Sequence, residues 1–253
     1  MNIKIQAIPA FSDNYIWSVH DDQHCVLVDP GEAPGALEFL RRGNLQLAGI
    51  LLTHHHADHV GGVDEIRAHH PAPTWGPSDP RMPGNITQVD EGDQVGIPAL
   101  GLKLEVLETP GHTTTHIAFH GHGLLFCGDT LFSVGCGRLF EGDPEQMQNS
   151  LDKLAALPPE TQVYCGHEYT ADNCSFALEV EPDNRALRAR CSEVAGLRRD
   201  ERITLPSTIG DEKAFNPFLR TRQPAVVRAA EEREPGHTAT PEEVFGVIRR
   251  WKD

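Results

Sequence analysis

Four short apolar segments, far apart in the sequence, each end in a side chain that can bind a metal ion. "GILLT" precedes His54, "LKLEVLETPG" precedes His112, "LLFCG" precedes Asp129, and "QVYCG" precedes His167. Short apolar runs bounded by turn residues are typical of β-strands. In layered α/β folds, residues just past the strand ends gather at one edge, where ligands usually bind. The sequence therefore predicts an α/β fold that brings these four side chains together.

The segment "THHHADHVGG" has a spacing suited to metal binding. In extended backbone, alternate side chains face the same way, so His54, His56 and Asp58 would point to one side. His59 breaks this alternation, so the chain must turn there, and a helix beginning near Asp58 would turn it. One side of the motif would then serve one metal ion, and the turn would carry Asp58 and His59 to a second.

The metal-binding candidates are five histidines and two aspartates, and they outnumber the ligands of a single ion. They are His54, His56, Asp58, His59, His112, Asp129 and His167. A single catalytic zinc uses about three protein ligands plus water, so seven candidates suit two ions. Three imidazoles on one ion, an aspartate and two imidazoles on the other, and a bridging carboxylate form a reasonable partition. Without cysteine ligands the site suits two divalent ions, most readily Zn, with Fe or Mn as alternatives.

The organisation of the chain changes at about residue 170. Before it, "CVLVDPG", "LAGILLTH", "LKLEVLE", "IAFH", "LLFCGD" and "TQVYCGH" read as strands, and "VDEIRAHH" and "DPEQMQNSLDKLAAL" read as helices. Asp143 is the expected N-cap of the second helix, and Asp29 in "VDPG" reads most simply as a turn residue. After it, strand-like runs nearly vanish. We therefore predict a metal-binding domain over residues 1–169 and a helical domain over residues 170–253.

Charge and cysteine usage restrict the partners that the chain can have. The net charge of −15 disfavours nucleic acid and anionic membranes, and an anionic substrate would need a local cluster of cations. The six cysteines form no C-x-x-C pair, which suits reduced thiols rather than disulfides. No apolar stretch or leader-like N-terminus stands out. We expect a cytoplasmic monomer that binds neither nucleic acid nor membranes.

Several motifs together resemble a known superfamily. "THHHADH", "GH" at 111–112, "GDT" at 128–130 and "CGH" at 165–167 are similar to the ligand series of the metallo-β-lactamase fold. Within that superfamily, "DNY", "GCGRLFEGD", "CGHEYT" and "FNPFLR" resemble the glyoxalase II (hydroxyacylglutathione hydrolase) family. The resemblance covers essentially the whole chain, including the helical tail.

The resemblance implies a four-layer αβ/βα sandwich followed by a C-terminal helical domain that binds substrate. It implies one metal ion on His54, His56 and His112. A second ion would bind Asp58, His59 and His167, and Asp129 would bridge the two. The implied substrate contacts are Arg138, Tyr169, Asn173, Arg220 and Arg222.

The implied reaction is hydrolysis of the thioester of S-(2-hydroxyacyl)glutathione, as in S-D-lactoylglutathione to D-lactate and glutathione, in methylglyoxal detoxification. A hydroxide held by the two metal ions would attack the carbonyl, and Asp58 would act as a catalytic residue by orienting it. Glutathione is a net anion, so arginine side chains suit its recognition. The leaving thiolate, with a thiol pKa of about 8.5, needs no strong acid, and no G-x-S-x-G nucleophile motif is present.

Other functions share this fold and are kept as alternatives. A glutathione persulfide dioxygenase would use one iron, and a lactonase or another hydrolase of the fold would have little use for "GCGR" and "NPFLR". From outside enzymes, a structural or storage metal site would be closed and usually rich in sulfur. The chain also differs from common family members, with Arg138 for Lys, Phe140 for Tyr, Thr115 for Gly, and Gln223 near the position of a common Lys.

Overall fold

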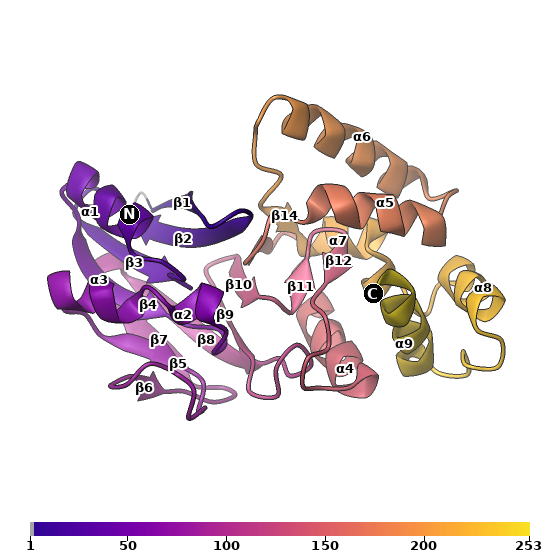
Figure 1. Ribbon diagram of the computed structural model, residues 1–253, viewed down its shortest axis with the longest axis horizontal. Coiled ribbons are helices and arrows are strands. Elements are labelled where there is room, and N and C mark those ends of the chain that lie inside the picture. Colours follow the sequence, from indigo (N-terminus) through magenta and orange to yellow (C-terminus); the bar gives the residue numbers. More distant parts are fainter. Residues whose placement is uncertain (1–2) are drawn as a thin grey trace. The chain divides into compact units, whose positions relative to one another are not determined.

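The computed structural model describes residues 3–253, which form two compact units (Figure 1). Unit 1 comprises Met1–Glu108 and Thr115–Gly128, and unit 2 comprises Thr109–Thr114 and Asp129–Asp253. These units are groups of residues that contact one another. The predicted boundary between residues 169 and 170 instead separates a metal-binding domain from a helical substrate-binding domain. The functional division therefore stays a prediction.

Unit 1 contains two sheets and three α-helices among its described residues. Its elements are β1 Lys4–Ala10, β2 Asn14–His20, β3 His24–Val28, α1 Pro34–Gly43, β4 Gln46–Leu51, α2 Ala57–Val60, α3 Val63–His69, β5 Thr74–Gly76, β6 Thr87–Gln88, β7 Gln94–Ile97, η1 Pro98–Leu100, β8 Leu102–Glu108, β9 Ile117–Gly121 and β10 Leu124–Gly128.

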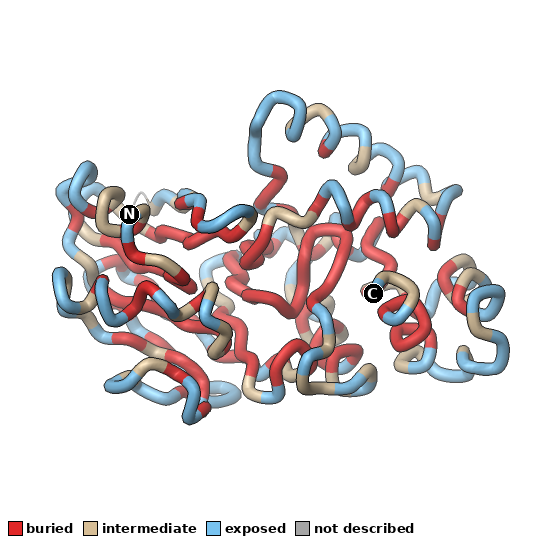
Figure 2. The backbone as a smooth tube through the Cα atoms, viewed as in Figure 1, coloured by how far each residue is buried: buried red, intermediate tan, exposed pale blue. Residues whose placement is uncertain are grey.

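The first sheet has the order β1-β2-β3-β4-β5-β6 and mixes strand directions. β1, β2 and β3 pair antiparallel, whereas β3 to β6 pair parallel. Parallel neighbours need a crossover, and α1 and α3 supply two of them. α1 buries Ala36 and Leu40 in a core cluster that also holds Leu27, Ile50 and Ile66. Strands β2 and β3 are buried along most of their length (Figure 2), which is typical of strands covered on both faces of a sheet.

The second sheet of unit 1 contains the antiparallel series β7, β8, β9 and β10. β8 alternates buried Leu102 and Leu104 with exposed Lys103 and Glu105, as its sequence predicts. The "HGHG" turn joins β9 to β10 through His122 and Gly123, with φ of 55° and 76°. Positive φ at both central residues is the conformation that suits a tight hairpin.

Unit 2 is mainly helical. Its elements are β11 Leu131–Phe132, β12 Gly135–Cys136, α4 Pro144–Ala155, β13 Gln162–Cys165, α5 Thr170–Val180, α6 Arg185–Arg199, β14 Ser207–Thr208, α7 Ile209–Phe215, η2 Pro217–Leu219, α8 Pro224–Arg233 and α9 Pro241–Lys252. A small core joins Val134, Leu187, Val194 and Phe215. The helices after residue 170 confirm the change of organisation seen in the sequence. No described helix is both long and apolar enough to cross a membrane.

Helix α4 begins with the cap predicted for it. The Asp143 side chain accepts a hydrogen bond from Gln146 N at 2.8 Å, and the Gln146 side chain accepts one from Asp143 N at 3.2 Å. This reciprocal pair satisfies two backbone donors that the first turn leaves without helical partners. α4 also fixes the loop before His112, because Ser150 Oγ donates to Pro110 O at 2.7 Å.

Replacing Asp143 by Ala should lower the stability of the protein by about 1 kcal/mol, since a Ser, Thr, Asn or Asp N-cap contributes roughly that amount. Urea unfolding followed by circular dichroism measures the shift. The exposed Asn149→Ala on the same helix is the control and should shift the midpoint less. Equal midpoints for the two variants would show that the cap contributes nothing.

Candidate metal ligands and anion-binding cavity

In unit 1, three histidine rings of the predicted motif lie together just past strand β4. The ring centroids of His54 and His56 are 4.7 Å apart, and those of His54 and His59 are 4.1 Å apart. His54 and His59 are buried, and the motif turns into the short helix α2 where His59 was expected to break the alternation. The ring of His116 stacks on that of His54, with centroids 4.7 Å apart.

A hydrogen-bond relay from Asp29 orients two of these rings. Asp29 Oδ1 accepts from Thr53 N at 2.8 Å, and Oδ2 accepts from Thr53 Oγ1 at 2.7 Å. Oδ2 also accepts from His59 Nδ1 at 3.1 Å, while Thr53 Oγ1 lies 3.0 Å from His54 Nδ1. Because Thr53 donates its hydroxyl proton to Asp29, its oxygen accepts from His54 Nδ1. Both histidines therefore carry their proton on Nδ1 and present the lone pair of Nε2, as metal-binding histidines usually do.

Asp29 thus does more than form the turn that its sequence context suggested. One ligand atom from each of Asp29, His54 and His59 lies within 4.8 Å of the others. Both oxygens of Asp29 already accept protein hydrogen bonds, however, so its position suits orienting the ligands better than binding the ion.

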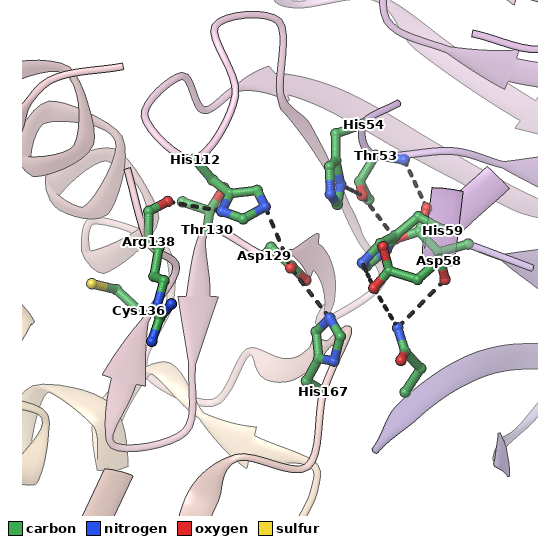
Figure 3. A network of polar contacts seen from close by, with 12 residues as sticks. Thr53, His54, Asp58, His59, His112, Asp129, Thr130, Cys136, Arg138 and His167 are labelled. Carbon is green, nitrogen blue, oxygen red and sulfur yellow. Dashed lines mark hydrogen bonds and ion pairs between the residues drawn. The ribbon is translucent and has the colours of Figure 1, made fainter. Parts of the chain in front are cut away.

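Asp58 lies in the same cluster and remains partly accessible. Asn14 Nδ2 donates to Asp58 Oδ2 at 2.9 Å. His59 Nε2 lies 3.6 Å from the same oxygen (Figure 3). The Asp58 side chain is 41% exposed. A Cβ on Gly31 would lie 1.8 Å from Asp58 O, so only glycine permits this close backbone approach. Asp58 is therefore held in place while its carboxylate reaches solvent.

In unit 2, His112, Asp129 and His167 form a second cluster. Asp129 Oδ2 lies 3.5 Å from His112 Nε2 and 3.3 Å from His167 Nε2 (Figure 3). All three residues are buried. His112 Nδ1 donates to Arg138 O at 2.8 Å, which again places the proton on Nδ1 and the lone pair on Nε2. A carboxylate between two imidazole nitrogens suits a bridging ligand.

Gly137 of the "GCGR" segment lies directly against this cluster. A Cβ on Gly137 would lie 1.9 Å from Asp129 O and 3.0 Å from His112 Nδ1. Any larger residue at position 137 would displace Asp129 or His112. The following residue, Arg138, supplies the carbonyl that orients His112.

A cavity of about 470 Å³ opens beside this cluster within unit 2. Its lining comprises His112, Asp129, Phe132, Cys136, Arg138, Phe140, Tyr169, Asp172, Asn173, Arg249 and Lys252. Arg138, Arg249 and Lys252 supply three cations, and Phe132, Phe140 and Tyr169 supply aromatic surface. The lining also holds the Asp129 and Asp172 carboxylates, so the three cations leave the cavity with a small local excess of positive charge in a protein of net charge −15.

Burial perturbs one of these cations. Burial, and then the positive charge of Arg249, lowers the pKa of Lys252 to about 8. Its ammonium donates to Asn173 Oδ1. Arg249 is buried and donates to Cys136 O at 3.1 Å. Arg138 is the most accessible of the three, with Nε 3.5 Å from Asp253 Oδ1.

The structure separates the five expected substrate contacts into two groups. Arg138, Tyr169 and Asn173 line the cavity, and the Tyr169 ring stacks on His167 with centroids 4.6 Å apart. Arg220 and Arg222 do not line it and hold carboxylates elsewhere in unit 2: Arg220 Nε is 2.7 Å from Glu181, and Arg222 Nη2 is 2.6 Å from Asp152. These pairs occupy the two guanidinium groups expected to bind substrate.

The sequence interpretation did not single out Asp29, Arg249 or Lys252. Asp29 had a usable signal, since an aspartate just past the apolar run "CVLV" repeats the pattern of the other strand-end residues. Arg249 and Lys252 belong to helix α9 at spacing i, i+3, which places them on one face. Only packing reveals that this face lines the cavity.

The donor sets fit divalent transition metals. Imidazole nitrogens and carboxylate oxygens suit Zn, Fe or Mn, and no described cysteine belongs to either cluster. The relay from Asp29 and the Arg138 carbonyl prepare the histidines in the tautomer that a metal requires.

The two parts of the chain match two family models. Residues 11–167 match the metallo-β-lactamase superfamily, and residues 168–253 match the hydroxyacylglutathione hydrolase C-terminus. The chain therefore has the metallo-β-lactamase fold, with mixed sheets and helices and a C-terminal helical region.

Comparison with individual proteins identifies the family within this superfamily. A hydroxyacylglutathione hydrolase of Aeromonas salmonicida is 52% identical over 97% of this chain and 97% of its own length. The crystal structure of ETHE1 from Myxococcus xanthus is 26% identical with a TM-score of 0.68, over 99% of this chain and 91% of that one. The structure of TTHA1623 in a di-iron-bound form is also 26% identical, with a TM-score of 0.62, over 85% and 100%. The chain belongs to the hydroxyacylglutathione hydrolase family of the metallo-β-lactamase superfamily.

Replacing Asp29 by Ala should weaken zinc binding roughly 10- to 100-fold, the usual cost of losing a residue that orients a metal ligand. The reason is that His54 and His59 would lose the relay that fixes their tautomers. Competition with a chromophoric chelator measures the affinity. The exposed Asp90→Ala removes the same charge as a control; matching affinities in the two variants would rule out the orienting role.

Proposed function

We propose that the chain hydrolyses the thioester of S-(2-hydroxyacyl)glutathione, with S-D-lactoylglutathione as the leading substrate. The observation that carries the proposal is the cationic, aromatic cavity beside the His112–Asp129–His167 cluster within one unit. It offers ligands for a metal and a binding surface for an anionic thiol conjugate side by side. The similarity, over nearly the whole chain, to a protein named hydroxyacylglutathione hydrolase supports the same reaction.

Two divalent ions, zinc in the first place, would be held by the seven ligands expected from the sequence. His54, His56 and His112 would hold one ion; Asp58, His59 and His167 would hold the other; and Asp129 would bridge them. The di-iron-bound form of a protein 26% identical supports two ions rather than one. When bound, such ions lower the pKa of water and polarise a carbonyl group.

The side chains of this chain have separate tasks in the proposed reaction. Asn14 holds Asp58 Oδ2, so the Asp58 carboxylate can orient the attacking water and accept its proton. Asp29, Thr53 and the Arg138 carbonyl keep the imidazoles of His54, His59 and His112 in one tautomer. The departing glutathione thiolate, with an unperturbed thiol pKa of about 8.5, leaves without a general acid.

We assign substrate recognition to the cavity and not to Arg220 and Arg222. Arg138, Arg249 and Lys252 would attract the carboxylates of glutathione, and Tyr169 and Phe140 would contact its apolar parts. Asn173 would act mainly by holding Lys252. Residues 1–169 would thus supply all seven metal ligands together with Arg138, Phe140 and Tyr169, and residues 170–253 would add Arg249 and Lys252. The monomeric state and the cytoplasmic location remain predictions from the sequence.

Supplying S-D-lactoylglutathione and following the loss of thioester absorbance tests the proposal. We expect turnover that disappears after chelation and returns with zinc, and a loss of at least 1000-fold in Asp129→Ala, since the expected bridging ligand is gone. Asp183→Ala, whose side chain is 98% exposed, is the matched control and should retain full activity. Turnover that persists in the metal-free protein would refute the proposal.

The same preparations distinguish the alternatives. Oxygen uptake with glutathione persulfide and one iron per chain would indicate the dioxygenase. Hydrolysis of a lactone without thioester turnover would indicate a different hydrolase of the fold. Bound metal with none of these activities would indicate a structural or storage site.

The role of Lys252 predicts a specific pH dependence. Its pKa is lowered to about 8, so the ammonium is charged below this pH and neutral above it. kcat/KM of the wild type should therefore fall relative to that of Lys252→Arg as the pH rises through about 8, because arginine stays charged. A pH-independent ratio of the two would exclude Lys252 as the titrating cation.

The same assay compares the contribution of Lys252 to substrate binding with that of Arg220 and Arg222. Lys252→Ala should raise KM about 10-fold or more with little change in kcat, as expected for a lost charge-assisted contact. The double variant Arg220→Ala, Arg222→Ala should change KM less than 3-fold. A larger increase in the double variant would show that Arg220 and Arg222 bind substrate.

A further inference from the structure

The turn between β11 and β12 is strained. Val134 has φ of 61° although it is β-branched, and its side chain is fully buried. A left-handed backbone is unfavourable for such a residue. Strain of this kind persists only where surrounding groups hold the backbone in place, and it clusters at functional sites. The residues that hold this turn are therefore candidates for a functional role.

Two fully buried polar side chains from the "FNPF" region hold it. Glu212 Oε2 accepts a hydrogen bond from Val134 N at 2.8 Å. Asn216 Nδ2 donates to Phe132 O at 3.1 Å, to Gly135 O at 2.9 Å and to Glu212 Oε2 at 3.0 Å. Burial raises the pKa of the Glu212 carboxyl, against the effect of these hydrogen bonds. A buried carboxyl is a costly choice where packing alone would suffice.

The hairpin that they hold carries contacts of the site. The Phe132 ring meets His167 edge-on, with centroids 5.8 Å apart and an interplanar angle of 89°. It meets Tyr169 at 5.3 Å and 87°. Asn173 Nδ2 donates to Ser133 O at 3.0 Å, so the same turn also anchors the residue that holds Lys252.

We propose that Glu212 and Asn216 are positioning residues, which hold the strained Ser133–Val134 turn and so fix Phe132 against His167 and Tyr169. The proposal rests on the proposed function, in which His167 binds metal and Tyr169 contacts substrate. In this proposal the asparagine of the "FNPF" motif, Asn216, serves to hold the turn. Neither residue lines the cavity.

Histidine NMR of the zinc-loaded protein tests the positioning without any substrate. The His167 ring resonance is assigned with His167→Gln, and Phe132→Ala gives its position without the Phe132 ring current. In Glu212→Ala the resonance should move at least halfway to the Phe132→Ala position. In Glu212→Gln, which keeps an oxygen for Val134 N, it should stay near the wild type. The exposed Glu160→Ala is a further control.

Relief of strain supplies the second test. Glycine at position 134 adopts positive φ without cost, so Val134→Gly should keep the turn formed without Glu212. We expect Glu212→Ala to lower kcat/KM at least 10-fold, and the double variant with Val134→Gly to recover at least 5-fold of that loss. Asn216→Ser, which lacks the bridging amide, should resemble Glu212→Ala, and it replaces that variant if Glu212→Ala does not fold.

The outcomes are decisive in either direction. An unmoved His167 resonance in the folded variants would overturn the positioning role. Additive effects of Glu212→Ala and Val134→Gly, with no recovery, would also overturn it and would leave Glu212 as a contributor to stability alone. If the wild type fails to hydrolyse the thioester, the proposed function fails, but the NMR result still reports whether the turn fixes His167.

Discussion

The position of one proton on the rings of His54, His59 and His112 is a constraint on which both candidate ligand clusters depend. An imidazole binds a metal through the nitrogen that lacks the proton, so its other nitrogen needs a fixed acceptor. Asp29 supplies that acceptor directly to His59 and through Thr53 to His54. In unit 2 the Arg138 carbonyl does the same for His112. Glycines allow the backbone to approach two other candidate ligands closely, at Gly31 beside Asp58 and at Gly137 beside Asp129.

Much of the fold could be predicted because the strands and helices satisfy local rules. A few adjacent residues determine each of three features: the alternation in β8, the turn with two positive φ angles before β10, and the capping box of α4. The family similarity confirms the metallo-β-lactamase fold. The hairpin of β1 and β2 gave no clear signal, since β2 is buried almost throughout and lacks a two-residue alternation. Short strands such as β14, with two residues, depend on partners distant in sequence.

The site could be predicted where ligand chemistry marks the residue, and not where packing selects one cation among many. Histidines and aspartates after strands are unusual enough to identify, and the structure gathers them into two clusters. Arginines are common, so the sequence does not reveal that Arg220 meets Glu181 while Arg249 faces a cavity. That difference arises from how α5, η2 and α9 pack. Lys252 becomes notable only once burial has lowered its pKa.

The length of the Asp29 relay has a consequence for protein design. Its hydrogen bonds join residues 24 and 30 positions apart, from the end of β3 to the loop after β4 and to α2. A designer who grafts only the seven-residue run from Thr53 to His59 onto another scaffold would transfer donors whose rings can exchange tautomers. The smallest portable version of this half-site is two adjacent parallel strands with the loop that follows each, so the graft must carry a supersecondary unit rather than a peptide.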